Sequence, residues 1–444
     1  MAGLAPGPRG RPIVGSYFDI QRDPLGFFVR ASRDYGHVFA FSAALQRPWY
    51  HISHPEYLEH VLQRGFSNYP KGRFGELISL VSGRGLLALD GEAWSRQRRL
   101  MQPAFHRDRL AALTTVIQND TSRMIDEWDR LPGRPSVVEL HAEFSRLTLG
   151  ITARILFGID IGNSADRIYG EYLRTLEYLN YRLVHPFALP WPVPTPANLR
   201  YRSALGRLNE MLDEQVEAAR RSGAARGGLL AMLLETRDEH DQPMSHAQLR
   251  AEMRTAIAAG HETTSTALFW TCYLLAGHPD SERRVHDEVD ALSGPPAFED
   301  LGRLPFTRMV IDEAMRLYPS VFWQGRVAVE DDEIGGYRIP AGSSVVLGFY
   351  VAQRHPDFWT DPDRFDPDRF ARGVGTRPRG AFLPFGLGPR QCIGIHLANI
   401  ETAMVVASVA RRFRLRPVEE GEIRPEVMAA LRPKRGVMFR LERR

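Results

Sequence analysis

Cysteine is nearly absent from this chain of 444 residues, which contains only Cys272 and Cys392. Two cysteines cannot build a disulfide framework, nor a zinc or iron–sulfur site made of cysteines alone. Each cysteine therefore has to be interpreted from its own surroundings. Cys272 lies among Trp270, Tyr273 and Leu274, and we expect it to be a buried structural residue.

Long apolar runs and linkers are also missing. A membrane-spanning helix needs about 20 consecutive apolar residues, and no stretch of this sequence approaches that length. The sequence does not start with a cationic segment followed by an apolar signal region. We therefore expect a cytoplasmic protein without a membrane span. Because no Gly/Ser-rich linker, low-complexity tract or fixed repeat divides the sequence, we expect one domain over residues 1–444.

Lysine is scarce as well, since Lys71 and Lys434 are the only lysines among 57 basic residues. The formal net charge is +4, and no basic run or alternation of aromatic and basic residues occurs. We therefore expect no binding of nucleic acid. A mild basic excess fits an acidic protein partner or no partner at all.

Helical patterns dominate the middle of the chain. Runs of β-branched and aromatic residues at 37–43 and 49–53 predict a hairpin, and further β-prone segments lie at 327–346 and after Pro433. The predicted helices are 92–105, 108–131, 139–157, 165–184, 199–221, 226–236 and 246–276. We therefore predict a mainly α fold with small β-sheets.

Five prolines between residues 185 and 196 forbid a helix there and make a stiff apolar loop. Such a loop fits three interpretations: a lid over a substrate, an ordinary connection that covers the core, or a contact with a membrane. The sequence leaves all three open.

The helix predicted from Ser245 is long enough to cross the molecule, since about thirty residues reach roughly 45 Å. Ser245 and Gln248 predict a capping box at its start. The small residues Ala259 and Gly260 form a notch in which a flat cofactor fits, and Thr263 can bond back to a carbonyl and open the helix. Close packing against another helix is the alternative.

The second cysteine lies in the glycine-rich loop 382–394. Gly386 and Gly388 allow the backbone to turn under the sulfur, where amides can donate hydrogen bonds. We expect a helix from about residue 393, so that Cys392 lies at its N-terminus, where free amides and the helix dipole lower the thiol pKa. A thiolate of this kind suits an iron ligand. A small cysteine packed at a helix start is the alternative.

This loop resembles the cytochrome P-450 family, whose haem-binding signature is Phe, two residues, Gly, one residue, Arg, one residue, Cys, one residue, Gly. Phe385, Gly388, Arg390, Cys392 and Gly394 match it at every position. The resemblance implies the P-450 fold, with a long central helix over a haem and the cysteine loop beneath it. It implies haem b as cofactor, with the Cys392 thiolate as axial iron ligand.

Further motifs in the expected order imply the other haem contacts. Trp94 and Arg98 match the family's Trp, three residues, Arg pattern, and buried haem propionates need cations such as the bidentate arginine. By this resemblance the haem contacts, apart from the ligand itself, are Trp94, Arg98, Ala259, Gly260, Arg326, Phe385, Gly386, Arg390 and Gly394.

The segment 313–316 matches another family motif. Glu313 and Arg316 share a helix face and can pair, and an exposed ion pair worth a few tenths of a kcal/mol is the ordinary interpretation. The resemblance implies instead that Arg369, in a Pro-Asp-Arg-Phe segment, completes a structural triad that locks the loop behind Cys392.

The pair Glu262-Thr263 matches the acid–alcohol pair of the family. The resemblance implies that Thr263 hydrogen-bonds the oxygen being activated and that Glu262 helps to relay protons from solvent. A Pro/Gly-rich start at residues 5–15 resembles the hinge that follows the anchor of microsomal members, an anchor we expect to be missing here. The chain is thus similar to a soluble bacterial member of the microsomal-like branch.

The resemblance implies a monooxygenase that inserts one oxygen atom from O2 into a hydrophobic small molecule, lipid-like, terpenoid or polyketide. We expect a monomer. Because no flavin or ferredoxin motif is present, both electrons are expected from a ferredoxin or flavodoxin with its reductase, docking near Arg390, Arg379 and Arg411. A peroxide-driven enzyme, an oxygen-independent isomerase or dehydratase, and a haem-based sensor are the alternatives. The retained acid–alcohol pair disfavours the first, and no output domain supports the last.

Analogy of position places apolar walls around the substrate. Core packing is the alternative for each wall residue, and we expect it to hold for about half of them. The predicted pocket residues are Phe74, Leu77, Ile78, Leu86, Leu87, Leu176, Leu179, Ile257, Ala258, Val321, Phe322, Trp323, Met428 and Leu431.

Overall fold

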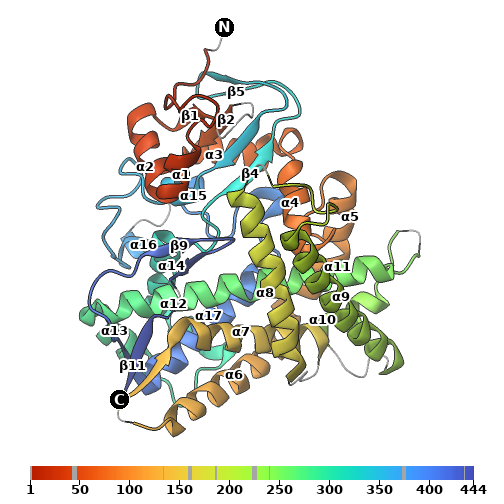
Figure 1. Cartoon of the computed structure of the whole chain (residues 1–444). Helices are drawn as coiled ribbons and strands as arrows, with labels where there is room; N and C mark the ends of the chain where they lie inside the picture. Colours follow the sequence, from red (N-terminus) through yellow and green to blue (C-terminus); the bar gives the residue numbers. More distant parts are fainter. Residues whose placement is uncertain are drawn as a thin grey trace.

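The computed structural model places most of the chain in helices, with four small sheets (Figure 1). The structure describes residues 3–42, 48–105, 107–133, 135–158, 163–185, 188–222, 228–239, 241–372, 377–434 and 436–444. The α-helices are α1 Tyr17–Arg22, α2 Pro24–Tyr35, α3 Pro55–Glu59, α4 Arg73–Ser82, α5 Gly91–Met101, α6 Arg107–Arg130, α7 Leu140–Phe157, α8 Asn163–Val184, α9 Pro196–Ser222, α10 Gly228–Glu235, α11 His246–Gly260, α12 Glu262–Ala276, α13 Pro279–Asp290, α14 Pro305–Leu317, α15 Phe349–Ala352, α16 Arg369–Arg372 and α17 Ile395–Arg412. The mainly helical class predicted from the sequence is confirmed.

The strands form four small sheets. One sheet has four strands in the order β1-β2-β7-β4, another has the order β3-β11-β8, and two pairs join β9 with β10 and β5 with β6. Their bounds are β1 Val38–Phe41, β2 Trp49–Ile52, β3 Ser136–Glu139, β4 Gln324–Val327, β5 Asp332–Ile334, β6 Tyr337–Ile339, β7 Ser344–Leu347, β8 Phe413–Pro417, β9 Pro425–Val427, β10 Leu431–Pro433 and β11 Met438–Arg443. The predicted hairpin is confirmed, because β1 and β2 pair antiparallel with Val38 opposite Ile52.

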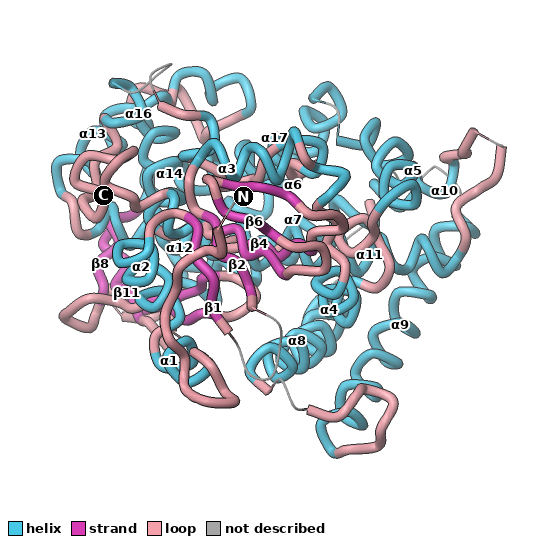
Figure 2. Tube along the Cα trace, turned by 90° about the horizontal axis from the view of Figure 1, so that it is seen from above, coloured by secondary structure: helices cyan, strands magenta, loops and turns pink. Residues whose placement is uncertain are grey.

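Helix α12 is the centre of the largest hydrophobic core. It packs against α7, α14 and α17, and its side chains are buried almost throughout because apolar residues cover its whole circumference. Figure 2 shows α9 and α10 at one edge of the molecule, away from the strands. The helices α12, α14 and α17 therefore form the core against which other helices pack.

The long central helix is interrupted. Helix α11 ends at Gly260 and α12 begins at Glu262, with His261 between them. The hydroxyl of Thr263 donates to the Ala259 carbonyl (2.7 Å), as predicted, and Thr148 of α7 donates to the His261 carbonyl (3.1 Å). Both hydroxyls occupy carbonyls at the break, so the interruption is held by side chains.

The start of this helix carries half of the predicted capping box. The Ser245 side chain accepts a hydrogen bond from the Gln248 amide (3.2 Å). The Gln248 side chain does not return to Ser245 and instead donates to Glu252 (2.7 Å) and to the Arg84 carbonyl (3.2 Å). A residue on the next turn of the helix and a carbonyl distant in the sequence have thus replaced the N-cap amide that the sequence pattern predicts as partner.

The proline-rich connection between α8 and α9 is non-helical over residues 188–195, as predicted; Pro186 and Phe187 lie outside the described residues. The Asn198 side chain donates to the carbonyls of Pro190 and Val193 (both 2.8 Å) and so pins the loop. Leu189 and Trp191 are about half exposed. Among the described helices, none has the combination of length and apolar character that crossing a membrane requires.

Candidate functional site

Cys392 is presented by a loop that depends on glycine. Gly386 and Gly388 have φ angles of 70° and 73°, a left-handed conformation that side chains disfavour. A Cβ on Gly388 would lie 2.2 Å from the carbonyl oxygen of Leu62. The Cys392 amide donates to the Phe385 carbonyl (2.9 Å) and closes the loop. These constraints fix the direction in which the sulfur points.

The Cys392 side chain is exposed, although protein surrounds it. Burial raises the pKa of its thiol, while the Gly394 amide and the Arg98 guanidinium lower it. A residue on the outer surface would not be desolvated in this way, so Cys392 lines a space inside the protein. Cys272 differs because it is buried in the core of α12, where burial raises its pKa to about 12. Its predicted structural role fits this packing.

The prediction that a helix dipole lowers the pKa of Cys392 was wrong. Helix α17 begins at Ile395 with Gly394 as its N-cap, so Cys392 precedes the helix. The net shift of the Cys392 pKa is upward because burial outweighs the two favourable contacts. A thiol in this position becomes a thiolate when a metal cation binds it, since coordinating thiols lose their proton.

A cluster of buried cations lies beside the cysteine loop. Lys71, Arg326 and Arg390 are close enough that the two arginines lower the pKa of Lys71, after the larger effect of burial. The facing acid is Asp90, which accepts hydrogen bonds from Arg390 and from the amides of Lys71 (3.1 Å) and Gly72 (3.0 Å). Three buried cations beside this carboxylate are unfavourable unless an anion joins them.

Two further predicted haem contacts, Arg98 and Trp94, lie beside this cluster of cations. Arg98 of α5 donates to the Gln391 carbonyl (3.0 Å), and the Arg390 guanidinium lies 4.5 Å from the ring centroid of buried Trp94. The Nε of Arg390 is buried without a hydrogen-bond partner in the part of the chain that the structure describes. This donor set fits a haem, with an exposed sulfur for the iron and buried cations for its two carboxylates.

Lys71 is a member of this cluster that the sequence analysis missed. Its side chain is buried and its ammonium group donates to the Leu87 carbonyl. The available signal was composition, because lysine is nearly absent from this arginine-rich chain. The docking face predicted near Arg390, Arg379 and Arg411 stays a prediction, with Arg379 exposed and the other two arginines engaged inside the protein. Arg390 is engaged with Asp90 and the Leu89 carbonyl, and Arg411 donates to the carbonyls of Val289 and Leu292.

The break in the central helix carries the predicted notch. Ala259 is exposed in the middle of an otherwise buried helix, and Thr263 beside it is half-buried. Gly260 has a different reason to be small, because a Cβ there would lie 2.9 Å from the Thr152 hydroxyl of α7. Close packing of α11 on α7, the alternative interpretation, therefore accounts for Gly260. Its contact with the haem stays a prediction.

Glu262 is buried and faces helix α8. Its carboxylate contributes, after burial itself, to the raised pKa of Tyr172. The neighbouring His261 is fully enclosed, its ring centroid lying 4.6 Å from that of Tyr169. Within the described residues both of its ring nitrogens lack a hydrogen-bond partner, and burial lowers its pKa to about 3. Glu262 of the acid–alcohol pair is thus enclosed by other residues of the protein.

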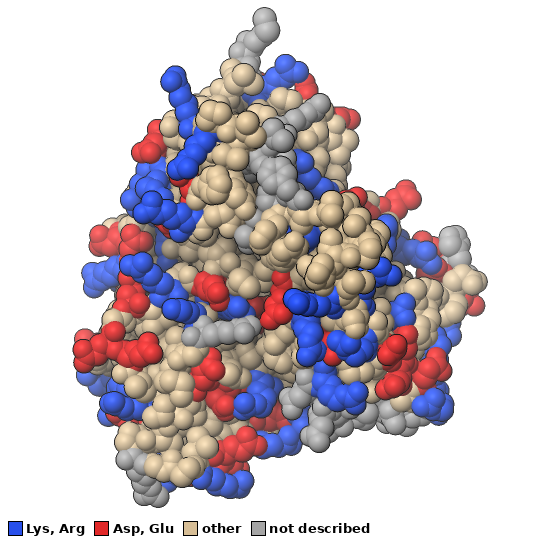
Figure 3. All heavy atoms as spheres, in the orientation of Figure 1, with Lys and Arg blue, Asp and Glu red and all other residues tan. Residues whose placement is uncertain are grey.

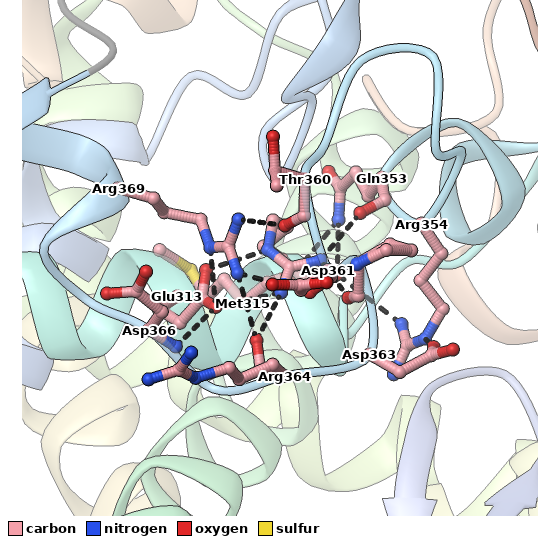
Figure 4. Close-up of polar contacts among 12 residues, drawn as sticks. Glu313, Met315, Gln353, Arg354, Thr360, Asp361, Asp363, Arg364, Asp366 and Arg369 are labelled. Carbon is pink, nitrogen blue, oxygen red and sulfur yellow. Dashed lines mark hydrogen bonds and ion pairs between the residues drawn. The ribbon is translucent and has the colours of Figure 1, made fainter.

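The structure brings Glu313, Arg316 and Arg369 together, and Figure 4 shows Glu313 and Arg369 at this place. Arg316 binds Glu313 bidentately (2.7 and 2.8 Å), and Arg369 Nε donates to the same carboxylate (3.0 Å). Glu313 and Arg316 have no exposed side-chain surface, so the alternative of a surface ion pair is wrong. Both arginines also donate to backbone carbonyls of residues 353–364.

Gln353 connects this triad to the cysteine loop and was not found from the sequence. Its Nε2 donates to the carbonyls of Met315 and Arg316 (both 3.1 Å), and its Oε1 accepts from the Leu383 amide (2.9 Å). It is fully buried. No spacing rule marks a glutamine whose partners lie 30 and 37 residues away.

The predicted pocket residues separate into two groups. Leu86, Leu176, Leu179 and Ile257 belong to one apolar cluster, against which Leu77 and Ala258 pack. Buried Glu252 helps to shape it, because its two carboxylate oxygens accept from the Leu86 amide (3.0 Å each). The residues outside this cluster are buried Phe74, Phe322 and Leu431, half-buried Ile78, Val321, Trp323 and Met428, and exposed Leu87.

Some residues of the second group have core contacts. Leu431 is fully buried, and its carbonyl accepts from the Trp270 indole (2.8 Å). Phe74 packs edge-on against Trp49 and Trp323 at 5.5 and 5.9 Å. Core packing, the alternative kept for each wall residue, thus accounts for Leu431 and Phe74.

Comparison with known proteins gives consistent matches. A family model described as Cytochrome P450 matches residues 5–440. A cyclooctat-9-en-7-ol 5-monooxygenase of Streptomyces melanosporofaciens is 36% identical over 426 residues, which cover 94% of this chain and 90% of that protein. A pentalenene oxygenase of Streptomyces avermitilis is 31% identical over 448 residues, covering 100% and 98%. The crystal structure of the cytochrome P450DA haem domain has the same fold, with a TM-score of 0.90 at 24% identity, covering 100% of this chain and 98% of that one.

Replacing Glu313 by Gln should destabilise the protein by about 3–5 kcal/mol, because it leaves two buried guanidinium groups without their carboxylate. We expect a lower unfolding midpoint in denaturant and a lower haem content after purification. The matched control is Asp368→Asn, which breaks the partly exposed bidentate pair with Arg284 and should cost below about 1 kcal/mol. Equal effects of the two variants would contradict the role of the triad.

Proposed function

Because this chain belongs to the cytochrome P450 family, we propose that Cys392 is the thiolate ligand of its haem iron. The enzyme is a haem-dependent monooxygenase acting on a hydrophobic small molecule. One combination of observations supports the assignment of the ligand: Cys392 has accessible surface, yet burial raises the pKa of its thiol, as expected for a sulfur that faces a space inside the protein. The other cysteine, Cys272, is enclosed in the core.

The haem propionates are assigned to the cation cluster of Lys71, Arg326 and Arg390, with Arg98 and Trp94 beside it. The supporting argument is electrostatic, because these buried cations outnumber the facing Asp90 carboxylate. The haem contacts of Ala259, Gly260, Phe385, Gly386 and Gly394 stay predictions.

When bound, the haem supplies the oxygen-activating chemistry. At the break of the central helix, Thr263 would hold a proton for the oxygen that is activated, and Glu262 would replenish it. The Thr263 hydroxyl now donates to the Ala259 carbonyl, and a rotation of its side chain would redirect the proton into the notch. Glu262, which is buried near Tyr172, would exchange protons through the α8 side.

The substrate class that we propose is a terpenoid. Two relatives are named for oxidation of cyclooctat-9-en-7-ol and of pentalenene. The cluster of Leu86, Leu176, Leu179 and Ile257 offers apolar side chains that suit such a skeleton. Terpenoid oxidation also agrees with one of the three classes expected from the sequence.

Redox partners supply the electrons of P450 monooxygenases, and we propose a ferredoxin or flavodoxin with its reductase for this one. Its sequence contains no flavin or ferredoxin motif. Acidic and basic side chains are interspersed over the face drawn in Figure 3. This face therefore has no large area of one charge that would steer a charged partner protein toward it. The monomeric state, the cytoplasmic location and the single domain stay predictions.

Replacing Cys392 by Ser should abolish the thiolate-type Soret band of the reduced carbon monoxide complex, since the hydroxyl cannot supply the sulfur ligand. Absorption spectra of purified protein measure this directly. Cys272→Ala serves as the control and should keep the band. A Cys392→Ser variant that retains the band would overturn the assignment of the ligand.

Replacing Thr263 by Ala should lower the product formed per pair of electrons consumed by about tenfold or more, because a positioned proton donor is lost. Parallel assays of NAD(P)H consumption, product and hydrogen peroxide give this ratio. Thr266→Val is the control on the same helix, since its buried hydroxyl has no hydrogen-bond partner among the described residues. Unchanged coupling in Thr263→Ala would exclude the proposed role.

A substrate screen should distinguish the terpenoid proposal from a lipid-like one. We expect cyclic terpene hydrocarbons and alcohols to shift the Soret band of the oxidised enzyme at lower concentrations than unbranched fatty acids of similar carbon number. Titrations followed by difference spectroscopy give the comparison. Tighter binding of the fatty acids would reject a terpenoid substrate while leaving the monooxygenase itself intact.

A further inference from the structure

A second group of metal-binding side chains lies outside the functional site. His37, His355 and Asp357 each offer a ligand atom, and these atoms all lie within 4.8 Å of one another. His37 immediately precedes β1, whereas His355 and Asp357 follow α15. The group thus joins two segments that are more than 300 residues apart in the sequence.

The distances within this group fit a shared metal ion better than hydrogen bonds. Asp357 Oδ2 lies 3.4 Å from His37 Nε2 and 3.5 Å from His355 Nδ1. N–H···O hydrogen bonds are shorter, at about 2.7–3.2 Å. Zinc bonds of about 2.0–2.2 Å arranged tetrahedrally separate neighbouring ligand atoms by roughly 3.3–3.5 Å. Two of the separations between the ligand atoms therefore have the length expected around a tetrahedral zinc ion.

The His355 ring already presents a lone pair to this group. The Asp357 amide donates to His355 Nδ1 over a long 3.3 Å, so this nitrogen is an acceptor, and a bound ion would replace the weak contact.

The surroundings hold the two rings while leaving a way in for an ion. The His54 ring packs edge-on against His37 at 4.9 Å, but His54 is not one of the residues whose ligand atoms come together in this group. Phe358 packs against the rings of His37 and His355, at 5.7 Å from each. The Asp357 side chain is 61% exposed, which allows an ion and its water molecules to enter.

We propose that His37, His355 and Asp357 bind a zinc ion, with water completing a four-coordinate site. Two imidazoles and one carboxylate form a donor set that zinc prefers. The ion would tie the start of β1 to the segment just beyond Gln353, which supports the cysteine loop. Its expected effect is on stability, since zinc bound to the folded chain raises the unfolding temperature.

The test uses the full haem-loaded chain without a histidine tag, freed of metals by a chelator and titrated with zinc against a chromophoric competitor. We expect one zinc ion per chain, and a loss of affinity of more than about tenfold in His37→Gln and in Asp357→Asn. Asp357 is exposed, so its variant is expected to fold. The carbon monoxide spectrum confirms that each variant is intact.

His246→Gln is the matched control. His246 also lies beside two carboxylates, Asp213 at 3.6 Å and Glu217 at 3.7 Å, but they face different ring nitrogens and cannot share an ion with it. Its zinc affinity should equal that of the unaltered protein, and zinc should raise the unfolding temperature in both. Absence of stoichiometric binding, or undiminished binding in Asp357→Asn, would overturn the proposal.

Discussion

The buried carboxylate of Glu313 is the constraint on which the cysteine loop depends. It lies between two guanidinium groups, and their remaining N–H groups donate to backbone carbonyls between residues 353 and 364. Because a desolvated charge tolerates no missing partner, these bonds fix the path of a segment that has little regular structure. The Gln353 side chain accepts a hydrogen bond from the Leu383 amide, which fixes the position of the Cys392 loop relative to this segment. The loop of Cys392 is thus positioned by buried charges that lie outside the proposed haem site.

The site that this scaffold presents is incomplete without an anion and a metal cation. Lys71, Arg326 and Arg390 are buried with Asp90 as the facing acid, and the thiol of Cys392 is held in its neutral form by burial. The carboxylates and the iron of a bound haem would relieve both problems at once. Cofactor binding is therefore expected to contribute to the stability of the fold, because only the folded chain assembles these groups.

Much of this arrangement could be predicted from the sequence because it rests on local patterns. Helical periodicity located α5 to α12 closely, and the motifs around Glu313, Arg369 and Cys392 named residues that the structure brings together. The pKa of Cys392 could not be predicted, since burial by distant segments decides its direction. Lys71 and Gln353 escaped notice for the same reason: their partners are set by tertiary packing and not by spacing.

The break in the central helix is stabilised both by a local motif and by tertiary contacts. Thr263 alone explains one released carbonyl, that of Ala259, as expected from the sequence. The His261 carbonyl is occupied by Thr148 of α7, and the Thr263 carbonyl by Ser320 (2.7 Å). Side-chain hydroxyls thus donate to three carbonyls at the break, which reduces the cost of interrupting the helix. The notch beside Ala259 is therefore a built feature of the folded protein, and its shape is set before any ligand arrives.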